Sequence, residues 1–362
     1  MSPLWQDLPL KVAQQALRAR AHLGALQDQL EREVLLPAQP PDGRSVRVGV
    51  VQLEGRLFAR AADYAAHMAR LCRQALKEGA QLLVFPEDTG SYPLAGLLPF
   101  LERLLAGGGQ ASPGDAVRQG EAPVLTLFRV LAPAARAVHQ LTFSTLARLG
   151  RAYILAGSTL ALDEAGRVYK EAHLYGPDGT LLLAQRKTHL FPTEALWGLS
   201  RGEEIQVVTT PCGRLAAPIC MDHTYFEPIR IAWLQGAEII LDPAADAARY
   251  NFYTQARGVW SRVQESPAYG IHCLMVGRIL GNEFGGRSGV YAPLALTPHG
   301  DGIIAQARTG DTEEVFCATL DLELLRRYRG SYGSAFNLAL YRRYLPAAYA
   351  QSARNPTGVP GQ

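Results

Sequence analysis

The chain has 362 residues, of which 48% are hydrophobic and 19% charged, and its formal net charge at pH 7 is +3. This length and apolar content are enough to bury a sizeable core, in one large domain or in two. The small net charge and the lack of long lysine or arginine runs argue against nucleic acid, or another acidic polymer, as a partner.

The first segment, residues 1–44, is predicted to be a helical arm. Residues 8–34 place apolar side chains at helical spacing among Gln, Arg and Glu, and the sequence PAQPPDG then ends the helix. We expect this helix to pack on its own subunit or on a neighbour, because a membrane-surface helix would carry more basic and aromatic residues. The N-terminus lacks the continuous apolar core of a signal peptide, and no apolar run of membrane-spanning length follows. We therefore expect neither export nor a membrane span.

A strand, helix, strand unit opens the main domain, which we expect to cover residues 45–330. The β-rich run VRVGVVQL starts at Val46, a helical pattern covers residues 60–78, and the apolar run QLLVF stops before Pro86. This order predicts parallel pairing of the two strands. The following insertion, about residues 95–150, mixes apolar helical pieces with the loop-like sequence AGGGQASPGDAVRQGEAP, and we expect it to be the least ordered internal part.

The rest of the main domain alternates between single strands, helices and hairpins. AYILAGSTLAL is a predicted strand, and the next two strands form a hairpin that turns at the Pro-Asp-Gly of residues 177–179. Strand GRLAAPIC, helix EPIRIAWLQGA, strand EIILDPAA, a helix over residues 253–266, strand IHCLMVGRIL and a hairpin around residues 297–302 follow. This mixture predicts an α/β fold with a two-layer sheet core and helices outside. Residues 331–362 form a predicted C-terminal tail.

Three reactive side chains stand where predicted strands end. Glu87 follows LLVFP, Lys187 follows LLLAQR, and Cys220 follows RLAAPI. A cysteine thiolate is a nucleophile that needs a base or a positive neighbour at pH 7. Glu87 could take the thiol proton and later return it to a leaving amine. Lys187 could stabilise both the thiolate and an oxyanion as a compact ammonium.

Each of these residues also has an ordinary interpretation. A glutamate after a strand is commonly a solvated loop residue or a helix cap, an isolated lysine is commonly a surface charge, and a strand-end cysteine is commonly inert core. Lysine is nevertheless scarce, since the chain has only Lys11, Lys77, Lys170 and Lys187 among many arginines. The five cysteines form no CxxC pair or metal-type cluster, which predicts reduced thiols and a cytoplasmic setting.

The surrounding sequence resembles the nitrilase superfamily of carbon–nitrogen hydrolases. The resemblance lies in LLVFPED around Glu87, RKTHLF around Lys187, and GRLAAPICMDHTYFEPIR with QGAEIILDPAA around and after Cys220, in the family's order. With VRVGVVQL and GDTEEVFCATLDLELLRRYR, it extends over about residues 45–330. It implies a four-layer α-β-β-α sandwich, here with an appended N-terminal helix. It also implies homodimers or higher homo-oligomers joined through helical faces, and no metal or organic cofactor.

The resemblance further implies a fourth catalytic residue and a reaction. Glu194 stands where the family's second glutamate falls, and it would hold Lys187 or the substrate amide. The reaction would be hydrolysis of a small linear amide or N-carbamoyl compound through a thioester on Cys220. Glu87 would act as base and acid, with its pKa raised by a partly buried site. Lys187 and the backbone N–H of Met221 would hold the oxyanion.

Several positions depart from the family pattern and weaken any transfer of substrate preference. Met221 replaces the aromatic residue that commonly follows the cysteine, and Asp222 leans toward the amidases. Substrate-binding candidates are Met221, Tyr92, His223 and Tyr225. For the aromatic candidates ordinary core packing is an equal alternative, and a loop histidine is more commonly a structural hydrogen-bonding residue than an acid or base.

The same thiolate chemistry would serve a nitrilase or an acyltransferase in which an amine replaces water. A non-catalytic binding protein on the same scaffold is a further alternative, although the intact set of Glu87, Lys187 and Cys220 argues against it. Cys220 could also be a redox sensor, but no resolving cysteine is evident in the sequence nearby.

Overall fold

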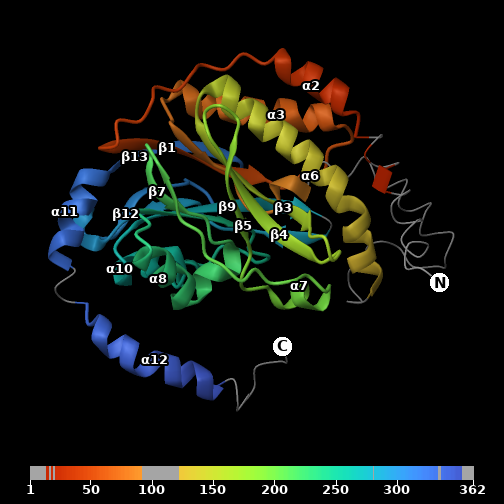
Figure 1. The fold of residues 1–362 in the computed structure, drawn as a ribbon. Helices are drawn as coiled ribbons and strands as arrows, with labels where there is room; N and C mark the ends of the chain where they lie inside the picture. Colours follow the sequence, from red (N-terminus) through yellow and green to blue (C-terminus); the bar gives the residue numbers. More distant parts are fainter. Residues whose placement is uncertain are drawn as a thin grey trace.

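A computed structural model of the chain describes residues 14, 15, 18, 21–91, 122–279, 281–332 and 336–352. The structure is a mixed α/β fold, as the sequence predicts, in which helices flank a large central sheet (Figure 1). Among the described helices, none combines the length and apolar character that crossing a membrane requires.

The central sheet has 13 strands and follows the order β5-β4-β3-β2-β1-β9-β8-β7-β6. Strands β10, β11 and β12 extend it beside β9, and β13 pairs with β1. The strands are β1 (Ser45–Glu54), β2 (Leu82–Val84), β3 (Tyr153–Leu162), β4 (Val168–Tyr175), β5 (Leu181–Arg186), β6 (Val208–Thr210), β7 (Gly213–Ala216), β8 (Ile239–Ala244), β9 (Tyr269–Ile279), β10 (Asn282–Phe284), β11 (Gly289–Tyr291), β12 (Ile303–Gln306) and β13 (Glu314–Asp321).

The predicted parallel unit is confirmed, because β1 pairs in parallel with β2 through Val48 opposite Leu82. The predicted hairpin is confirmed as well, since β4 and β5 pair antiparallel around residues 177–179. Strand β1 is buried on both faces, which explains why its sequence is a nearly continuous apolar run rather than an alternating one.

The described helices are α2 (Leu23–Glu31), α3 (Ala61–Lys77), α6 (Ala122–Gly150), α7 (Pro192–Leu196), α8 (Phe226–Leu234), α9 (Phe252–Ala256), α10 (Val259–Glu265), α11 (Leu322–Tyr332) and α12 (Leu338–Ser352). The sequence of helix α3 explains both its packing and the point where it ends. Its buried face repeats at helical spacing through Tyr64, Met68 and Cys72, and it ends at Lys77, two residues before Gly79, whose φ of 81° suits glycine.

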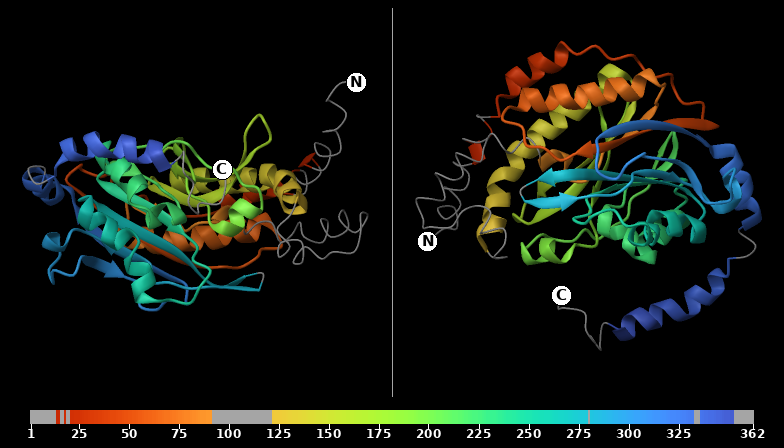
Figure 2. Two further views of the ribbon diagram at one scale, coloured as in Figure 1. Left: turned by 90° about the horizontal axis from the view of Figure 1, so that it is seen from below. Right: turned by 180° about the vertical axis from the view of Figure 1, so that it is seen from behind.

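Three of the apolar clusters among the described residues hold the sheet and helices together. One joins α2, α3 and α6 to one face of β1, β2 and β3. A second lies between the two halves of the sheet, where Val84 and Leu155 from one half meet Leu241 and Ile271 from the other. The third joins α8 and α10 to the outer side of β7 and β8. The helix groups accordingly lie on opposite sides of the sheet (Figure 2). This packing agrees with the predicted four-layer sandwich, although the layering itself stays a prediction.

The predicted N-terminal helix is interrupted at His22, since the described residues 14, 15 and 18 are helical and α2 begins after His22, which has a left-handed backbone with φ of 47°. Helix α2 packs on its own chain through the fully buried Leu26 and Leu30. In the predicted insertion, Ala122–Gly150 forms the long helix α6, while residues 95–121 lie outside the described part of the chain.

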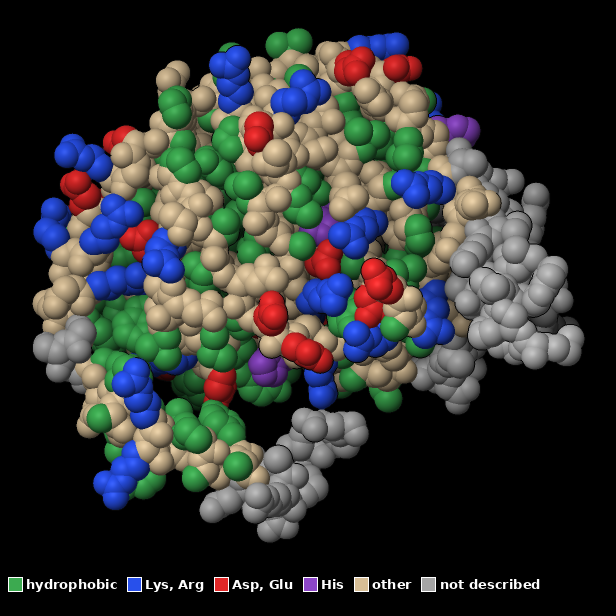
Figure 3. Space-filling view, viewed as in Figure 1, with side chains coloured by type: hydrophobic (Ala, Val, Ile, Leu, Met, Phe, Trp, Pro, Cys, Tyr) green, Lys and Arg blue, Asp and Glu red, His purple; other side chains and the backbone are tan. Residues whose placement is uncertain are grey.

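One predicted helix is divided in two. The pattern over residues 253–266 forms α9 and α10, which are separated at Gly258. A side chain at this glycine would meet the ring of His223, since a Cβ would stand 2.6 Å from its Cδ2 atom. On the molecular face shown in Figure 3, basic and acidic side chains are interspersed, in keeping with the small net charge.

Candidate active site

The fold brings the predicted strand-end residues into one buried site. Glu87 follows β2, Lys187 follows β5, and Cys220 begins a short 3₁₀ helix just beyond β7. Glu87 and Lys187 are each 1% exposed, and Cys220 is 7% exposed. Glu87 and Lys187 come from the half of the sheet formed by β1–β5, and Cys220 comes from the half formed by β6–β9. The site therefore forms only when the two halves pack together.

A buried network of hydrogen bonds joins Lys187 to both predicted glutamates. Its Nζ atom lies 2.8 Å from Glu87 Oε1 and 2.9 Å from Glu194 Oε2. Glu194 is itself fixed at the first turn of α7, where its Oε2 accepts the backbone N–H of Phe191 at 2.8 Å. Glu194 therefore lies next to Lys187, and its supporting role, which the family resemblance implies, stays a prediction.

A second lysine, Lys170 on β4, completes this network. Its Nζ lies 2.6 Å from Glu194 Oε1, 3.2 Å from Glu87 Oε1 and 3.1 Å from Asp88 Oδ2. The backbone N–H of Lys187 donates to the carbonyl of Lys170 at 2.9 Å, so the two lysines are cross-strand neighbours. The scarcity of lysine in the sequence pointed to Lys170, but no local motif assigned it a role.

Within this site the pKa values of the two glutamates shift in opposite directions. Burial raises the pKa of Glu87, although Lys170 and Lys187 oppose this effect. Burial also acts to raise the pKa of Glu194, but the same two lysines overcome it and hold that pKa at about 2. When Glu87 carries a proton, the two ammonium groups face two carboxylates, those of Glu194 and Asp88. Glu87 is therefore the carboxyl group suited to exchange a proton, and Glu194 stays anionic.

The nucleophile candidate has an unusual backbone. Cys220 has φ of 47°, in the left-handed region that costs a non-glycine residue free energy, and its N–H donates to Asp242 Oδ1 at 2.9 Å. Burial and the negative charge of Glu87 raise the pKa of the thiol, while Lys187 lowers it. The N–H of Met221 lies in the first turn of the 3₁₀ helix, where backbone donors lack partners within the helix.

Asp222 ties the loop of Lys187 to the turn of the nucleophile. Its carboxylate accepts the backbone N–H of Ile219 at 2.9 Å and that of His189 at 2.7 Å. It also accepts the hydroxyl of Thr188 at 2.6 Å. Because Thr188 and His189 directly follow Lys187, one buried carboxylate joins the segment after Lys187 to the turn that begins at Cys220.

A second buried carboxylate, Asp242, faces two imidazoles. His272 donates from Nδ1 to Asp242 Oδ2 at 2.6 Å, and His223 Nδ1 lies 2.7 Å from the same oxygen. Burial tends to raise the pKa of Asp242, but the two histidines hold it at about 2. Burial likewise favours neutral His223, yet the Asp242 charge raises the pKa of this histidine.

These three residues are also of the types that bind a metal ion, and their ligand atoms lie within 4.8 Å of one another. Ligand atoms around a tetrahedral zinc ion stand about 3.3 Å apart at ordinary bond lengths. Both imidazole nitrogens lie closer than that to Asp242 Oδ2, His272 Nδ1 within a hydrogen bond of 2.6 Å and His223 Nδ1 at 2.7 Å, and the other carboxylate oxygen already holds the Cys220 N–H. The arrangement fits a positioning network better than a metal centre.

The substrate-binding candidates occupy different surroundings. Met221 is partly exposed beside the nucleophile, His223 faces Asp242, and Tyr225 stacks on His189 with ring centroids 4.5 Å apart. Tyr92 lies outside the described residues. Their proposed contacts with substrate stay predictions.

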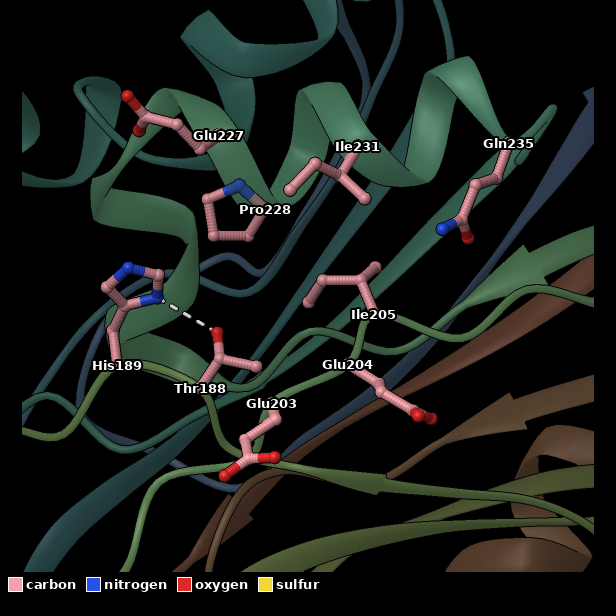
Figure 4. A pocket seen from close by; sticks show the side chains of 10 residues that line it. Thr188, His189, Glu203, Glu204, Ile205, Glu227, Pro228, Ile231 and Gln235 are labelled. Carbon is pink, nitrogen blue, oxygen red and sulfur yellow. Dashed lines mark hydrogen bonds between the residues drawn. The ribbon is translucent and has the colours of Figure 1, made fainter. Parts of the chain in front are cut away.

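A groove of about 520 Å³ lies next to this region, between α8 and the segment after β5. Figure 4 shows Pro228 and Ile231 of α8 facing Ile205 across it, with His189 and Thr188 at one end. Its lining contains none of Glu87, Lys187, Glu194 and Cys220, so the groove borders the loops of the site without containing the nucleophile.

Known proteins resemble this chain in sequence and in fold. The family model described as "Carbon-nitrogen hydrolase" matches residues 47–330. The "Probable hydrolase YhcX" of Bacillus subtilis is 33% identical over 192 residues, covering 52% of this chain and 37% of that protein. The "Omega-amidase NIT2" of Xenopus tropicalis is 24% identical over 276 residues, covering 72% of this chain and 83% of that protein.

The match thus spans little more than a third of the YhcX sequence, and it spans 55% of another relative, the bovine "Omega-amidase NIT2". Solved structures share the fold. Saccharomyces cerevisiae Nit3, described as a member of the nitrilase superfamily, has a TM-score of 0.58 at 22% identity, covering 83% of this chain and 97% of its own. An amidase from Nesterenkonia sp. has a TM-score of 0.58 at 20% identity, covering 83% and 98%.

Proposed function

The chain belongs to the carbon–nitrogen hydrolase family, and we propose that it hydrolyses a non-peptide C–N bond through a thioester on Cys220. The substrate would be a small linear amide or an N-carbamoyl compound. The observation that carries this proposal is the buried contact of Lys187 with both Glu87 and Glu194, beside a thiol that both Lys187 and Glu87 influence. Two oppositely tuned carboxylates and a fixed ammonium are the groups that such acyl transfer needs.

In the first half of the reaction, Glu87 takes the proton of the Cys220 thiol and the thiolate attacks the carbonyl carbon. The C–O double bond becomes a single bond to an oxyanion, which Lys187 and the N–H of Met221 stabilise. The C–N bond then breaks, and ammonia or an amine leaves with the proton from Glu87. The product is an acyl group joined to sulfur.

In the second half, Glu87 takes a proton from water as the water oxygen attacks the thioester carbon. The C–S bond breaks, the carboxylic acid leaves, and the proton returns to the thiolate. Glu87 and Glu194 keep Lys187 charged through both halves, and Glu194, which also pairs with Lys170, holds Lys187 in place within the buried site.

The relatives support this choice of reaction. Several are described as omega-amidases, and one structure of the Nesterenkonia amidase is described as showing the acetamide moiety of fluoroacetamide joined to its active-site cysteine. A nitrilase or an acyltransferase would use the same three residues, and a non-catalytic binding protein stays a further alternative.

The proposal extends to the setting of the enzyme. Five free cysteines, all within the described residues, suit a reducing cytoplasm. We also propose a homodimer or a larger homo-oligomer, which light scattering would test.

Intact-protein mass spectrometry after brief incubation with amides, carbamoyl compounds and nitriles tests the proposed chemistry. We expect the wild type to gain the mass of an amide substrate minus ammonia, and Cys220→Ala to gain nothing. Glu87→Gln should form or release the adduct far more slowly. Cys317→Ser, which alters another partly accessible thiol, should behave as wild type. Equal adducts in wild type and Cys220→Ala, or ammonia release by Cys220→Ala, would contradict the thioester route.

A further inference from the structure

One carboxylate next to the nucleophile has no role in the reaction described above. Asp246 lies in the loop after β8, and its Oδ1 atom stands 4.0 Å from the sulfur of Cys220. Its backbone carbonyl is held by the N–H groups of Ala248 at 2.8 Å and of Gly285 at 3.3 Å. The loop therefore holds this carboxylate at the reacting sulfur.

Asp246 differs from the other carboxylates around the site because no described residue forms an ion pair with it. Lys170 and Lys187 face Glu87 and Glu194, as described above, and histidines face Asp242. Within the described part of the chain, Asp246 has no ion pair, and the thiol is the only hydrogen-bond partner of its side chain. The charge of Asp246 contributes to the raised pKa of His223, but the Nδ1 atom of this histidine lies 2.7 Å from Asp242.

The position of Asp246 limits which substrate atom it can meet. In a thioester, the atom bonded to the acyl carbon lies about 2.7 Å from sulfur by ordinary bond lengths. A hydrogen bond of about 2.9 Å from that atom reaches an oxygen 4.0 Å from the sulfur. The partner of Asp246 is therefore a group on the acyl carbon or one atom further along, and not the distal end of a long substrate.

We propose that Asp246 determines specificity by accepting a hydrogen bond from an N–H group next to the reacting carbon. This inference rests on the proposed function and narrows its substrate class. An N-carbamoyl compound offers such an N–H on the reacting carbon itself, and an α-amino amide offers an ammonium one atom away. A plain carboxamide presents a CH₂ group there and offers the carboxylate no hydrogen bond. An acyl group with its own carboxylate at this position is repelled.

Three small test compounds with the same number of heavy atoms distinguish an N–H on the reacting carbon from an ammonium one atom further along. Methylurea carries N–H on the reacting carbon, glycinamide carries an ammonium one atom further, and propanamide carries neither. We expect wild type to prefer methylurea or glycinamide to propanamide by about tenfold in kcat/KM, the loss typical of an unpaired charged acceptor. Asp246→Leu, which removes charge and acceptor, should abolish either preference. Asp246→Asn, which removes only the charge, should abolish a preference for glycinamide but keep part of a preference for methylurea.

Alkylation of Cys220 tests the same proposal without turnover. Iodoacetamide and iodoacetate have nearly the same shape and differ in charge, and mass spectrometry can follow their reaction with Cys220 while Cys317 serves as a reference thiol. We expect the iodoacetate to iodoacetamide rate ratio to rise about tenfold in Asp246→Asn. Glu164→Gln, which removes an exposed charge, should keep the wild-type ratio.

The outcomes separate this proposal from the proposed function. The proposal is wrong if wild type, Asp246→Asn and Glu164→Gln all give the same iodoacetate to iodoacetamide rate ratio and the Asp246 variants keep the wild-type amide preference. Such a result would mean that Asp246 does not face the acyl group. Acyl adducts on Cys220 would still support the hydrolase in that case. If the ratio depends on Asp246 but Cys220 forms no adduct with any amide, charge selection at the thiol stands and the hydrolase function is wrong.

Discussion

The carboxylate of Asp242 accepts the backbone N–H of Cys220 at 2.9 Å, so Asp242 holds the proposed nucleophile through its main chain. Asp242 is fully buried, and its second oxygen is held by His272 and lies 2.7 Å from His223. The left-handed backbone at Cys220 is thus supported by a network that has no exposed member.

Replacing this carboxylate should impair the chemical step. In Asp242→Asn, the side-chain oxygen can still accept the Cys220 N–H, but its NH₂ group would face two imidazole nitrogens. We expect kcat to fall by about tenfold or more, the range for losing a hydrogen bond to a charged group. KM should change little, because Asp242 is inaccessible to substrate. The alkylation rate of Cys220 should fall in parallel. A lower melting temperature with unchanged kcat and alkylation would show a structural role only.

Lys170 offers a second test. In Lys170→Met, the buried carboxylates of Glu87 and Glu194 lose a counter-charge, so we expect the free energy of unfolding to fall by about 3 kcal/mol or more. Since Lys170 lowers the pKa of Glu87, its removal should raise that pKa and move the acid limb of kcat/KM to higher pH. Urea unfolding and pH–rate profiles measure both effects. The exposed Lys77→Met is the matched control, and equal behaviour of the two variants would contradict the prediction.

Gly157 positions Glu87 through a close backbone approach. Its φ is 70°, and a Cβ there would stand 1.8 Å from the carbonyl oxygen of Pro86, the residue before Glu87. We expect Gly157→Ala to displace Glu87 and lower kcat at least tenfold, as even a small misplacement can do. Gly166→Ala is the control, because Gly166 has φ of 74° and open space around it. Equal activities of the two variants would show that left-handed strain alone, without the clash, accounts for any effect.

Acid should weaken the fold through Glu194. Its pKa of about 2 lies below the ordinary 4.5, since the two lysines outweigh burial, so folding favours the charged form. This stabilisation is fully present above about pH 4.5, and it is lost as the pH falls toward about 2. Urea unfolding across this range should show the gap between wild type and Glu194→Gln closing as the pH falls. Glu164→Gln should follow the wild type, and a constant gap for Glu194→Gln would overturn the assignment.

The sequence predicted the parts of the site that lie in local motifs. Glu87, Lys187 and Cys220 each follow an apolar strand, and Glu194 opens a helix at the expected distance from the cysteine. Their roles in catalysis stay predictions until turnover is measured. Lys170 escaped assignment because its contacts depend on the register of β4 against β5, which no local pattern encodes.

Asp242 and His272 escaped for a similar reason. Both lie within buried strands, and they meet only because β8 and β9 pair in parallel with these two residues opposite each other. A polar side chain inside an apolar run was the available signal, since such a residue must find a partner. Tyr92 and the first part of the insertion lie outside the described residues, so those predictions stay as they were.

The left-handed backbone at Cys220 lowers the stability of the fold at the position where the proposed reaction needs a cysteine. A cysteine in this conformation costs about 1–2 kcal/mol relative to an unstrained one, whereas glycine adopts it freely. Relief of this strain opposes the greater backbone entropy that glycine loses on folding, so a library of variants selected only for surviving heat would tolerate Cys220→Gly and discard the proposed nucleophile. Selection for endurance would thus accept a residue at this position that selection for turnover rejects.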